Sequence, residues 1–164
     1  MTKELEQKFA KELELHQNII HKVCRSYTNN EAAHKDLFQE ITIQLWKAYP
    51  KFRGESKFST WMYRVAFNTA ISLYRKTKRN VETTQIYDNL KELEYHDYDD
   101  SADKQLKLLY KAIYSLNDIE KALALMYLED KSYKEIAKTL GISEVNARVK
   151  MNRTKTKLKN ILNP

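Results

Sequence analysis

The side chains best suited to recognising another molecule lie near the C-terminal end of the sequence. Arg148, Asn152 and Arg153 are spaced so that on a helix they share one face, with Val149 beside them. Arginine can make two hydrogen bonds to one guanine and asparagine two to one adenine, whereas lysine mostly neutralises phosphate. We therefore predict that this helix reads duplex DNA. The alternative is a solvated basic face on a terminal helix.

The residues before this helix predict a helix-turn-helix that positions it. Ser132 and Glu135 have the spacing of a capping box, in which side chains satisfy free N–H groups at the start of a helix. Gly141 then ends the first helix, and Ser143 caps the second one. Two short helices joined in this way, the second of them basic, are typical of a motif that enters the major groove.

A second candidate site lies between Phe52 and Arg79, where aromatic and basic residues alternate and no acid follows Glu55. Basic groups can follow a sugar-phosphate backbone while unstacked bases rest on aromatic rings, so this pattern favours single-stranded nucleic acid. We expect several of the aromatic side chains to be partly exposed. Phe58 and Trp61 have an equally good alternative role, which is to pack the loop onto the helices.

The helical pattern extends over the rest of the chain. Its 164 residues include only two glycines and two prolines, so the predicted fold class is all-α. We expect three helices, over residues 4–27, 31–49 and 60–79, the last of them capped by Ser59 or Thr60. Four more are expected after residue 104, the second capped by Asn117 or Asp118. The side chains expected to face inward on the third and the last helix are Met62, Val65, Ala66, Thr69, Leu73, Ala147, Met151, Thr154, Leu158, Ile161 and Leu162.

Charge divides the chain into three parts. The net charges are +7 for residues 1–79, −6 for residues 80–104 and +6 for residues 105–164. The middle part is aperiodic and acidic, which predicts a flexible linker between two small helical domains. The overall charge of +7 favours a polyanionic partner.

The sequence predicts neither catalysis nor a cofactor. Its four histidines are scattered without the spacing of metal ligands, and it has no glycine-rich phosphate loop. We therefore expect no catalytic residue, no metal, no cofactor and no enzymatic activity. The lone Cys24 fits a reducing cytosol, and no apolar run approaches the roughly 20 residues that cross a membrane. A cytoplasmic location without membrane insertion follows.

Three stretches together resemble bacterial sigma factors of the extracytoplasmic function (ECF) type, the smallest class of the sigma-70 family. DLFQE at residues 36–40, followed by Trp46, resembles the segment called region 2.2. FRGESKFSTWMYRVAFN at residues 52–68 is similar to regions 2.3 and 2.4. SYKEIA at residues 132–137, with the helix that follows as far as Arg153, is similar to region 4.2.

The resemblance implies two domains with three binding surfaces. The N-terminal three-helix region 2 would carry two of them, for core polymerase and for the −10 element. The C-terminal helix-turn-helix region 4 would carry the third, for the −35 element. The residues implied to dock on the largest subunits of core RNA polymerase are Asp36, Leu37, Gln39 and Glu40. Those implied to capture single-stranded −10 DNA and assist promoter melting are Phe52, Lys57, Phe58, Tyr63, Arg64 and Asn68. Those implied to bind the duplex −35 element are Ser143, Arg148, Val149, Asn152 and Arg153. An anti-sigma factor is a further partner that the family implies.

Two other classes of function remain open at this point. A stand-alone helix-turn-helix repressor or activator would use the N-terminal helices to oligomerise, and would need a symmetric dimer and a palindromic site. The sequence has no leucine-rich dimer seam. In a stand-alone regulator the aromatic and basic segment at residues 52–79 would also have no function. A helical scaffold protein is the more distant alternative. Phe67 and Ser72 stand where Arg and Asp are frequent in the family, so the preferred promoter sequences stay open.

Overall fold

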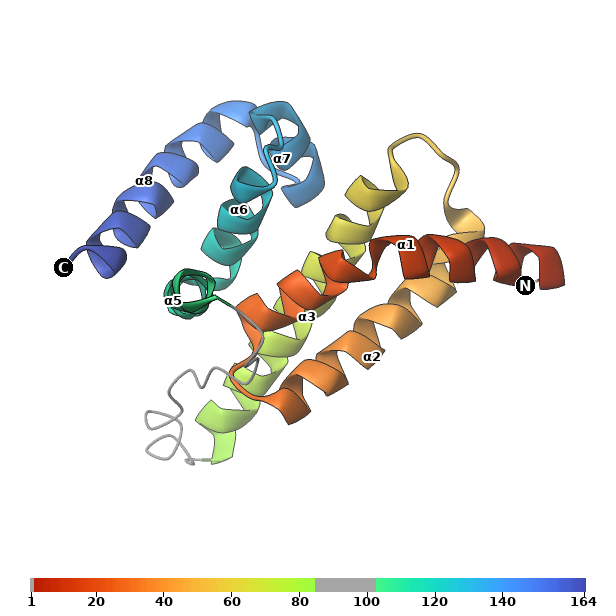
Figure 1. Cartoon of the computed structure of the whole chain (residues 1–164), viewed down its shortest axis with the longest axis horizontal. Helices are drawn as coiled ribbons and strands as arrows, with labels where there is room; N and C mark the ends of the chain where they lie inside the picture. The colour runs from red at the N-terminus through yellow and green to blue at the C-terminus, as the bar shows by residue number, and fades with distance from the viewer. Residues whose placement is uncertain (1, 85–102) are drawn as a thin grey trace.

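The computed structural model (Figure 1) describes residues 2–84 and 103–164, and only the backbone for residues 74–84. Within these ranges the chain forms seven α-helices and one short 3-10 helix and no strand, which confirms the all-α prediction. The elements are α1 (Lys3–Tyr27), α2 (Glu31–Ala48), η1 (Tyr49–Lys51), α3 (Phe58–Thr84), α5 (Lys104–Tyr114), α6 (Asp118–Leu128), α7 (Tyr133–Leu140) and α8 (Glu144–Leu162).

Side chains cap α6, α7 and α8 at the predicted residues. Asn117 accepts a hydrogen bond from the Glu120 amide at 2.9 Å, and the Glu120 carboxylate accepts one from the Asn117 amide at 3.1 Å. The hydroxyls of Ser132 and Ser143 accept bonds from backbone N–H groups three residues on, at 3.1 and 3.0 Å. Each such cap stabilises its helix by about 1 kcal/mol. Gly141 ends α7 with φ +70°, so the predicted turn is confirmed.

α3 begins before the predicted caps. It starts at Phe58, so neither Ser59 nor Thr60 is its cap. The Trp61 amide donates to the Lys57 carbonyl at 3.1 Å and closes the first turn instead.

The same helix continues past its expected end at Arg79 to Thr84, into the first residues of the predicted linker. No glycine or proline occurs between Gly54 and Gly141, so nothing in the local sequence stops the helix at Arg79. The rest of the linker, residues 85–102, lies outside the described residues, and its predicted flexibility stays a prediction.

α1, α2 and α3 pack on one another in the N-terminal half. Burying a side chain of leucine or isoleucine size stabilises a fold by about 1.5–3 kcal/mol, so a few positions at helical spacing suffice for a small core. Leu73, expected to face inward, is 37% exposed, so that expectation was wrong. The fully buried side chains of this half include Ile20, Val23, Ile41, Leu45 and Met62.

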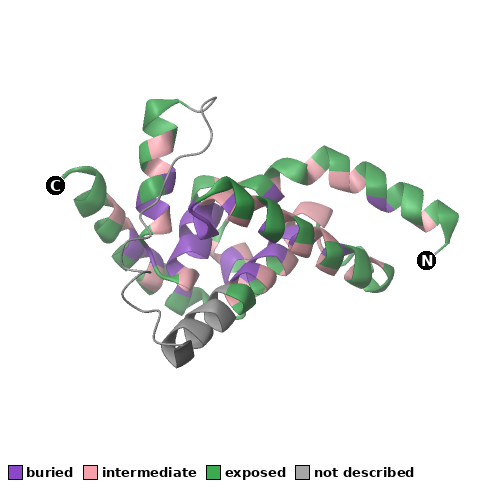
Figure 2. Ribbon diagram, turned by 90° about the horizontal axis from the view of Figure 1, so that it is seen from below, coloured by how far each residue is buried: buried purple, intermediate pink, exposed green. Residues whose placement is uncertain are grey.

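α6 is the central helix of the C-terminal half and contacts α5, α7 and α8. All of its residues from 120 to 126 are buried, as the purple segment at the centre of Figure 2 illustrates. The Glu120 carboxylate there pairs with Lys157 of α8 at 2.7 Å. Ile161 and Leu162 were expected to face inward but are 44% and 41% exposed, because the final turn of α8 lies at the edge of the packed helices.

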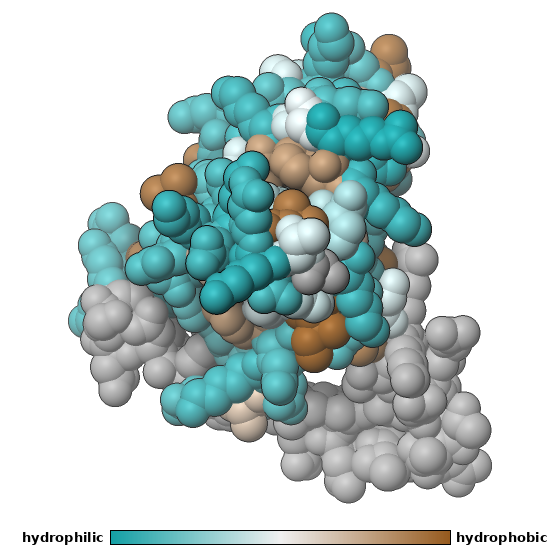
Figure 3. Space-filling model, turned by 90° about the vertical axis from the view of Figure 1, so that its right-hand side faces the viewer, coloured by the Kyte–Doolittle hydropathy of each residue, from teal (hydrophilic) through white to brown (hydrophobic). Residues whose placement is uncertain are grey.

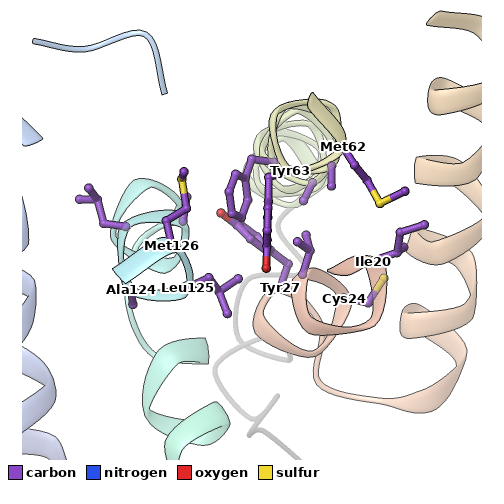
Figure 4. Close-up of a cluster of buried hydrophobic side chains, with 14 of the residues drawn as sticks. Ile20, Cys24, Tyr27, Met62, Tyr63, Ala124, Leu125 and Met126 are labelled. Atoms are coloured by element: carbon purple, nitrogen blue, oxygen red, sulfur yellow. The ribbon is translucent and has the colours of Figure 1, made fainter. Parts of the chain in front are cut away.

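The two halves of the chain share one hydrophobic core. α1 contacts α5 and α6, and α3 contacts α6 and α7. Figure 4 shows side chains of α1, α3 and α6 meeting at this junction, among them Tyr27, Tyr63 and Leu125. Several aromatic side chains of the 52–79 segment are partly exposed, as expected, namely Phe52, Phe58 and Trp61. Tyr63 and Phe67 are only 2% and 1% exposed, because α3 packs against the C-terminal half as well as against α1 and α2.

Candidate nucleic-acid interfaces

α8 presents four of the predicted DNA-reading residues to solvent. Arg148, Val149, Asn152 and Arg153 are all exposed on its first half. Exposed arginine and asparagine can make bidentate bonds to purines, and an exposed valine can contact a thymine methyl group. Ser143 differs from them, because its hydroxyl is already occupied as the helix cap.

Arg148 is held in place before any ligand arrives. Its Nη2 donates to the Glu144 carboxylate at 3.1 Å, and its guanidinium lies 5.4 Å from the centroid of the Tyr133 ring. The ion pair is exposed, so it contributes only a few tenths of a kcal/mol and can exchange for a guanine edge. The ring restricts the orientations of the guanidinium, which lowers the entropy that binding must remove.

Lys155 is a cation on α8 that sequence reasoning did not single out. Its Nζ lies 4.0 Å from the centroid of the Tyr127 ring. Hydrogen bonding to Tyr127 and Tyr133 raises the pKa of Lys155, and burial offsets part of the effect. The signal was present in the sequence, because Lys155 stands two turns after Arg148. Val145, which is 72% exposed on the first turn of α8, was also missed.

α3 brings three of the predicted strand-binding residues to one face. Lys57, which immediately precedes α3 and accepts the hydrogen bond of its first turn, and Arg64 and Asn68 on α3 are exposed and follow each other at intervals of seven and four residues. These are whole turns of an α-helix, so the three side chains lie in a row. A row of two cations and an amide can follow a phosphate backbone and bond to a base edge.

Phe52 of the loop before α3 packs with aromatic residues of α1, α2, η1 and α3 in a cluster that we name the aromatic knot. The Phe52 ring centroid lies 4.9 Å from that of Trp61, and the Phe58 centroid lies 5.4 Å from it. Phe52 and Phe58 are both half-buried, so the packing role that the sequence left open is present in the structure. Figure 3 views this end of the molecule, where apolar groups are visible between hydrophilic ones. The knot consists of Phe9, Trp46, Tyr49, Phe52, Phe58 and Trp61.

Tyr63 lies apart from the row on α3. Its buried hydroxyl has no hydrogen-bond partner among the residues that the structure describes. Leaving such a group unpaired costs about 1–3 kcal/mol. Burial raises the pKa of Tyr63, and Glu129 and Tyr110 raise it further. Its role in −10 binding stays a prediction, since this arrangement covers the ring.

The predicted polymerase-binding residues of α2 differ in how far they are exposed to solvent. Asp36 and Gln39 are exposed, and Glu40 is half-buried and accepts a hydrogen bond from Gln44 at 2.9 Å. Leu37 is 6% exposed and packs in the core, so in this form it can only position its neighbours.

Comparison with known protein families decides the classification. Residues 13–80 match the family Sigma-70 region 2, and residues 106–158 match the family Sigma-70, region 4. The chain belongs to the sigma-70 family. The first match includes the exposed row of Lys57, Arg64 and Asn68. The second match includes the helix-turn-helix, of which α8 is the second helix.

Relatives place this sigma-70 protein in the ECF class, as the sequence predicted. The ECF RNA polymerase sigma-E factor of Haemophilus influenzae is 27% identical over 140 residues, which are 79% of this chain and 74% of the relative. The ECF RNA polymerase sigma-E factor of Escherichia coli K12 is 29% identical over 140 residues, which are 79% of this chain and 73% of the relative.

Solved structures share the fold of this sigma factor. The sigma factor RpoE of Bartonella quintana, in complex with the anti-sigma factor NepR, matches with a TM-score of 0.76 and 18% identity, over 95% of this chain and 97% of that one. CnrH, in complex with the cytosolic domain of CnrY, matches with a TM-score of 0.58 and 20% identity, over 96% and 88%. Identities this low support the fold alone.

Three further observations concern the chemistry of this sigma factor. The described residues contain no group of three or more metal-ligating side chains close enough to hold an ion. Among the same residues, no helix combines the length and the apolar character that crossing a bilayer requires. Cys24 is buried, and burial raises the pKa of its thiol to about 12, so at neutral pH it is protonated and unreactive.

Proposed function

We propose that this sigma factor binds core RNA polymerase in the cytoplasm, directs it to promoters through the −35 and −10 elements, and helps to open the −10 DNA. The observation that carries the proposal is that one chain joins two sigma-70 regions, each with an exposed face suited to a different form of DNA. The protein itself catalyses no reaction, and the polymerase supplies the chemistry.

In the proposal, α8 reads the duplex −35 element. Arg148 and Asn152 bond to base edges in the major groove, Val149 makes an apolar contact, and Arg153 contacts the edge or a phosphate. Each good bidentate pair discriminates against a wrong base by about 1–3 kcal/mol. The exposure of all four residues on one stretch of α8 supports this role.

The −10 element is captured as a single strand by α3 and the loop before it. Lys57 and Arg64 neutralise phosphates, Asn68 bonds to a base, and the half-buried rings of Phe52 and Phe58 offer apolar surface for unstacked bases. Flipping a base costs a few kcal/mol, and stacking returns about 1–3 kcal/mol per base. Melting is thus assisted by trapping bases that open spontaneously.

The exposed carboxylate and amide of Asp36 and Gln39, with Glu40, form the surface proposed to dock on the largest polymerase subunits. An anti-sigma protein is proposed as a further partner. The sigma factor RpoE, which has this fold, has been solved in complex with the anti-sigma factor NepR, which supports the proposal for this chain.

Transcription from a reconstituted enzyme tests the proposal. Purified protein is added to bacterial core polymerase on a genomic DNA library, and the transcripts are sequenced. We expect start sites that share a −35 and a −10 element. A protein that binds a palindrome as a dimer and never binds core polymerase would contradict the proposal and favour a stand-alone regulator.

Matched variants locate the reading surface in the same assay. Arg148→Ala is expected to abolish or change promoter choice, whereas Lys159→Ala, which removes an exposed cation near the end of the same helix, is expected to preserve it. Equal losses in both variants would show that α8 acts by charge alone.

A further inference from the structure

The first turns of α1 carry a buried side chain that the proposed function does not use. Between Lys3 and Lys11, Phe9 is the only buried residue and Leu5 the only half-buried one. A short helical segment is marginally stable in water, so the packing of its apolar side chain keeps it in place. The match to Sigma-70 region 2 begins at residue 13, so the family pattern gives no role to Phe9.

Phe9 packs against aromatic side chains of two other elements. The centroid of its ring lies 5.3 Å from that of Trp46 on α2, at an interplanar angle of 73°, and 5.1 Å from that of Tyr49 in η1. In such edge-to-face and tilted pairs the positive edge of one ring meets the negative face of another. Figure 1 shows the start of α1 beside the end of α2 and the loop that leads to α3. Phe9 therefore restricts where the Tyr49 ring can lie.

Tyr49 connects Phe9 to the rings proposed to receive −10 bases. Its centroid lies 6.3 Å from that of Phe52, with the two rings stacked, and 6.1 Å from that of Phe58. The Tyr49 carbonyl also accepts a hydrogen bond from the Phe52 amide at 2.9 Å. A path of ring contacts therefore runs from α1 through Tyr49 to both rings.

α1 also touches the loop before α3 directly. His16 follows Phe9 by seven residues, so both side chains lie on one face of α1, and the His16 ring centroid is 5.4 Å from that of Phe58. The His16 ring is itself fixed, because its Nδ1 donates to the Glu12 carbonyl at 3.0 Å. Four of the six residues from 52 to 57 are exposed, so the position of this loop depends on its packed rings.

We propose that Phe9 is a positioning residue for the capture of the −10 strand, which holds Phe52 and Phe58, through Tyr49, in the arrangement on which unstacked bases rest. A ring that is already fixed loses less entropy when a base stacks on it. Phe9 is 4% exposed, so it acts through the other rings and not by touching DNA. The inference rests on the proposed function and adds the first turns of α1 to the −10 reader.

Binding of single-stranded DNA by the holoenzyme tests this role. Core polymerase with each variant is titrated with an oligonucleotide that carries the −10 sequence found by transcript sequencing. Phe9→Ala is expected to weaken this binding about tenfold, because mobile Phe52 and Phe58 rings return less stacking free energy. Binding of a duplex −35 fragment should be unchanged. Leu15→Ala, which shortens a side chain that is 75% exposed on the same helix, is the control and should bind both DNAs like the wild type.

A double-mutant cycle separates positioning from a general loss of structure. In a background with Phe52→Ala and Phe58→Ala, the rings through which Phe9 acts are gone, while the cationic row of α3 still binds the strand. Adding Phe9→Ala there should weaken binding by at most about twofold, because residues that act through the same group are not additive. The full loss in both backgrounds, or equal losses for −10 and −35 DNA, would overturn the proposal.

Circular dichroism shows whether the variants remain folded. Far-UV spectra should match that of the wild type, whereas the near-UV signal, which reports fixed aromatic packing, should weaken in Phe9→Ala. If Phe9→Ala unfolds, Phe9→Leu replaces it; this variant keeps most of the apolar volume without the ring and should lose about threefold in −10 binding. Wild-type −10 binding by the folded variant would overturn the proposal. If the wild-type holoenzyme itself binds no −10 strand, the proposed function fails, while the near-UV spectra still decide whether Phe9 orders the aromatic knot.

Discussion

Lys121 leads to a quantitative stability prediction, because its ammonium group is buried where α6 meets α1. Its side chain is 2% exposed, and Nζ lies 5.0 Å from the centroid of the Tyr27 ring and 4.6 Å from that of Tyr114. Burial lowers the pKa of Lys121 from 10.5 to about 8, and the nearby Asp118 offsets part of the effect.

The sign of the pH dependence follows from proton binding. Between about pH 8 and pH 10.5 the unfolded chain holds the Lys121 proton and the folded chain has lost it, so this residue makes folding more favourable as pH rises. The complete transition is worth about 3.4 kcal/mol, and the rise from pH 7 to pH 9 is about 1.3 kcal/mol. At pH 7 the folded chain still holds the Lys121 proton, so it carries the net cost of burying the charge, which Asp118 reduces.

Lys121→Met retains an unbranched apolar side chain and removes the charge. We expect the variant to be about 1–2 kcal/mol more stable than the wild type at pH 7, after the loss of the two cation–π contacts. That advantage should shrink by about 1.3 kcal/mol at pH 9. Urea unfolding followed by circular dichroism at both pH values measures it.

Comparing the wild type with Lys121→Met at each pH cancels the contributions of other titrating groups to the difference in the free energy of unfolding. Burial also raises the pKa of Cys24 and Tyr27, which lowers stability as pH rises, but both groups are present in the wild type and in the variant. A stability difference that is the same at pH 7 and pH 9 would refute the argument, because the Lys121 charge would then not be buried at a cost.

Four further predictions concern single residues. Gly141→Ala should lower the free energy of unfolding by about 1–2 kcal/mol, because φ is +70° there and an added Cβ meets no atom that would add a clash; a neutral result in urea unfolding would contradict this. Arg148→Ala should weaken binding at one −35 base pair by about 1–3 kcal/mol, and an equal loss on all duplexes would make it a phosphate contact. Lys155→Ala should reduce the salt slope of duplex binding by about 0.9 without altering base preference; an unchanged slope would exclude phosphate contact. Asn68→Ala should reduce permanganate reactivity of −10 thymines and leave −35 duplex binding unchanged; the reverse pattern would contradict the assignment to the −10 strand.

Local sequence signals predicted the helix-turn-helix in detail. Ser132, Gly141 and Ser143 act through backbone groups within a few residues of themselves, so their roles depend little on the rest of the fold. The outward residues of α8 were predictable for the same reason, since helical spacing fixes which side faces away from Ala147 and Met151.

Contacts between distant parts of the chain were not predictable from periodicity. The sequence pattern of α3 suggested one buried stripe, whereas the helix has two packed sides, and Tyr63 faces the second one. Lys22 and Glu129 form an ion pair although 107 residues separate them, and nothing in their local sequence predicts this contact. Lys121 was likewise indistinguishable from the exposed lysines around it until α1 was placed beside α6.

The aromatic knot has a practical consequence for experiments. Both tryptophans of the chain, Trp46 and Trp61, belong to it, and the C-terminal half contains none. Tryptophan fluorescence, excited selectively, is therefore an optical signal from the N-terminal half alone. A base that stacks on Phe52 or Phe58 should quench the emission, while duplex bound by α8 should leave it unchanged. The order of the two DNA-binding steps can thus be followed by stopped-flow mixing in the unlabelled protein.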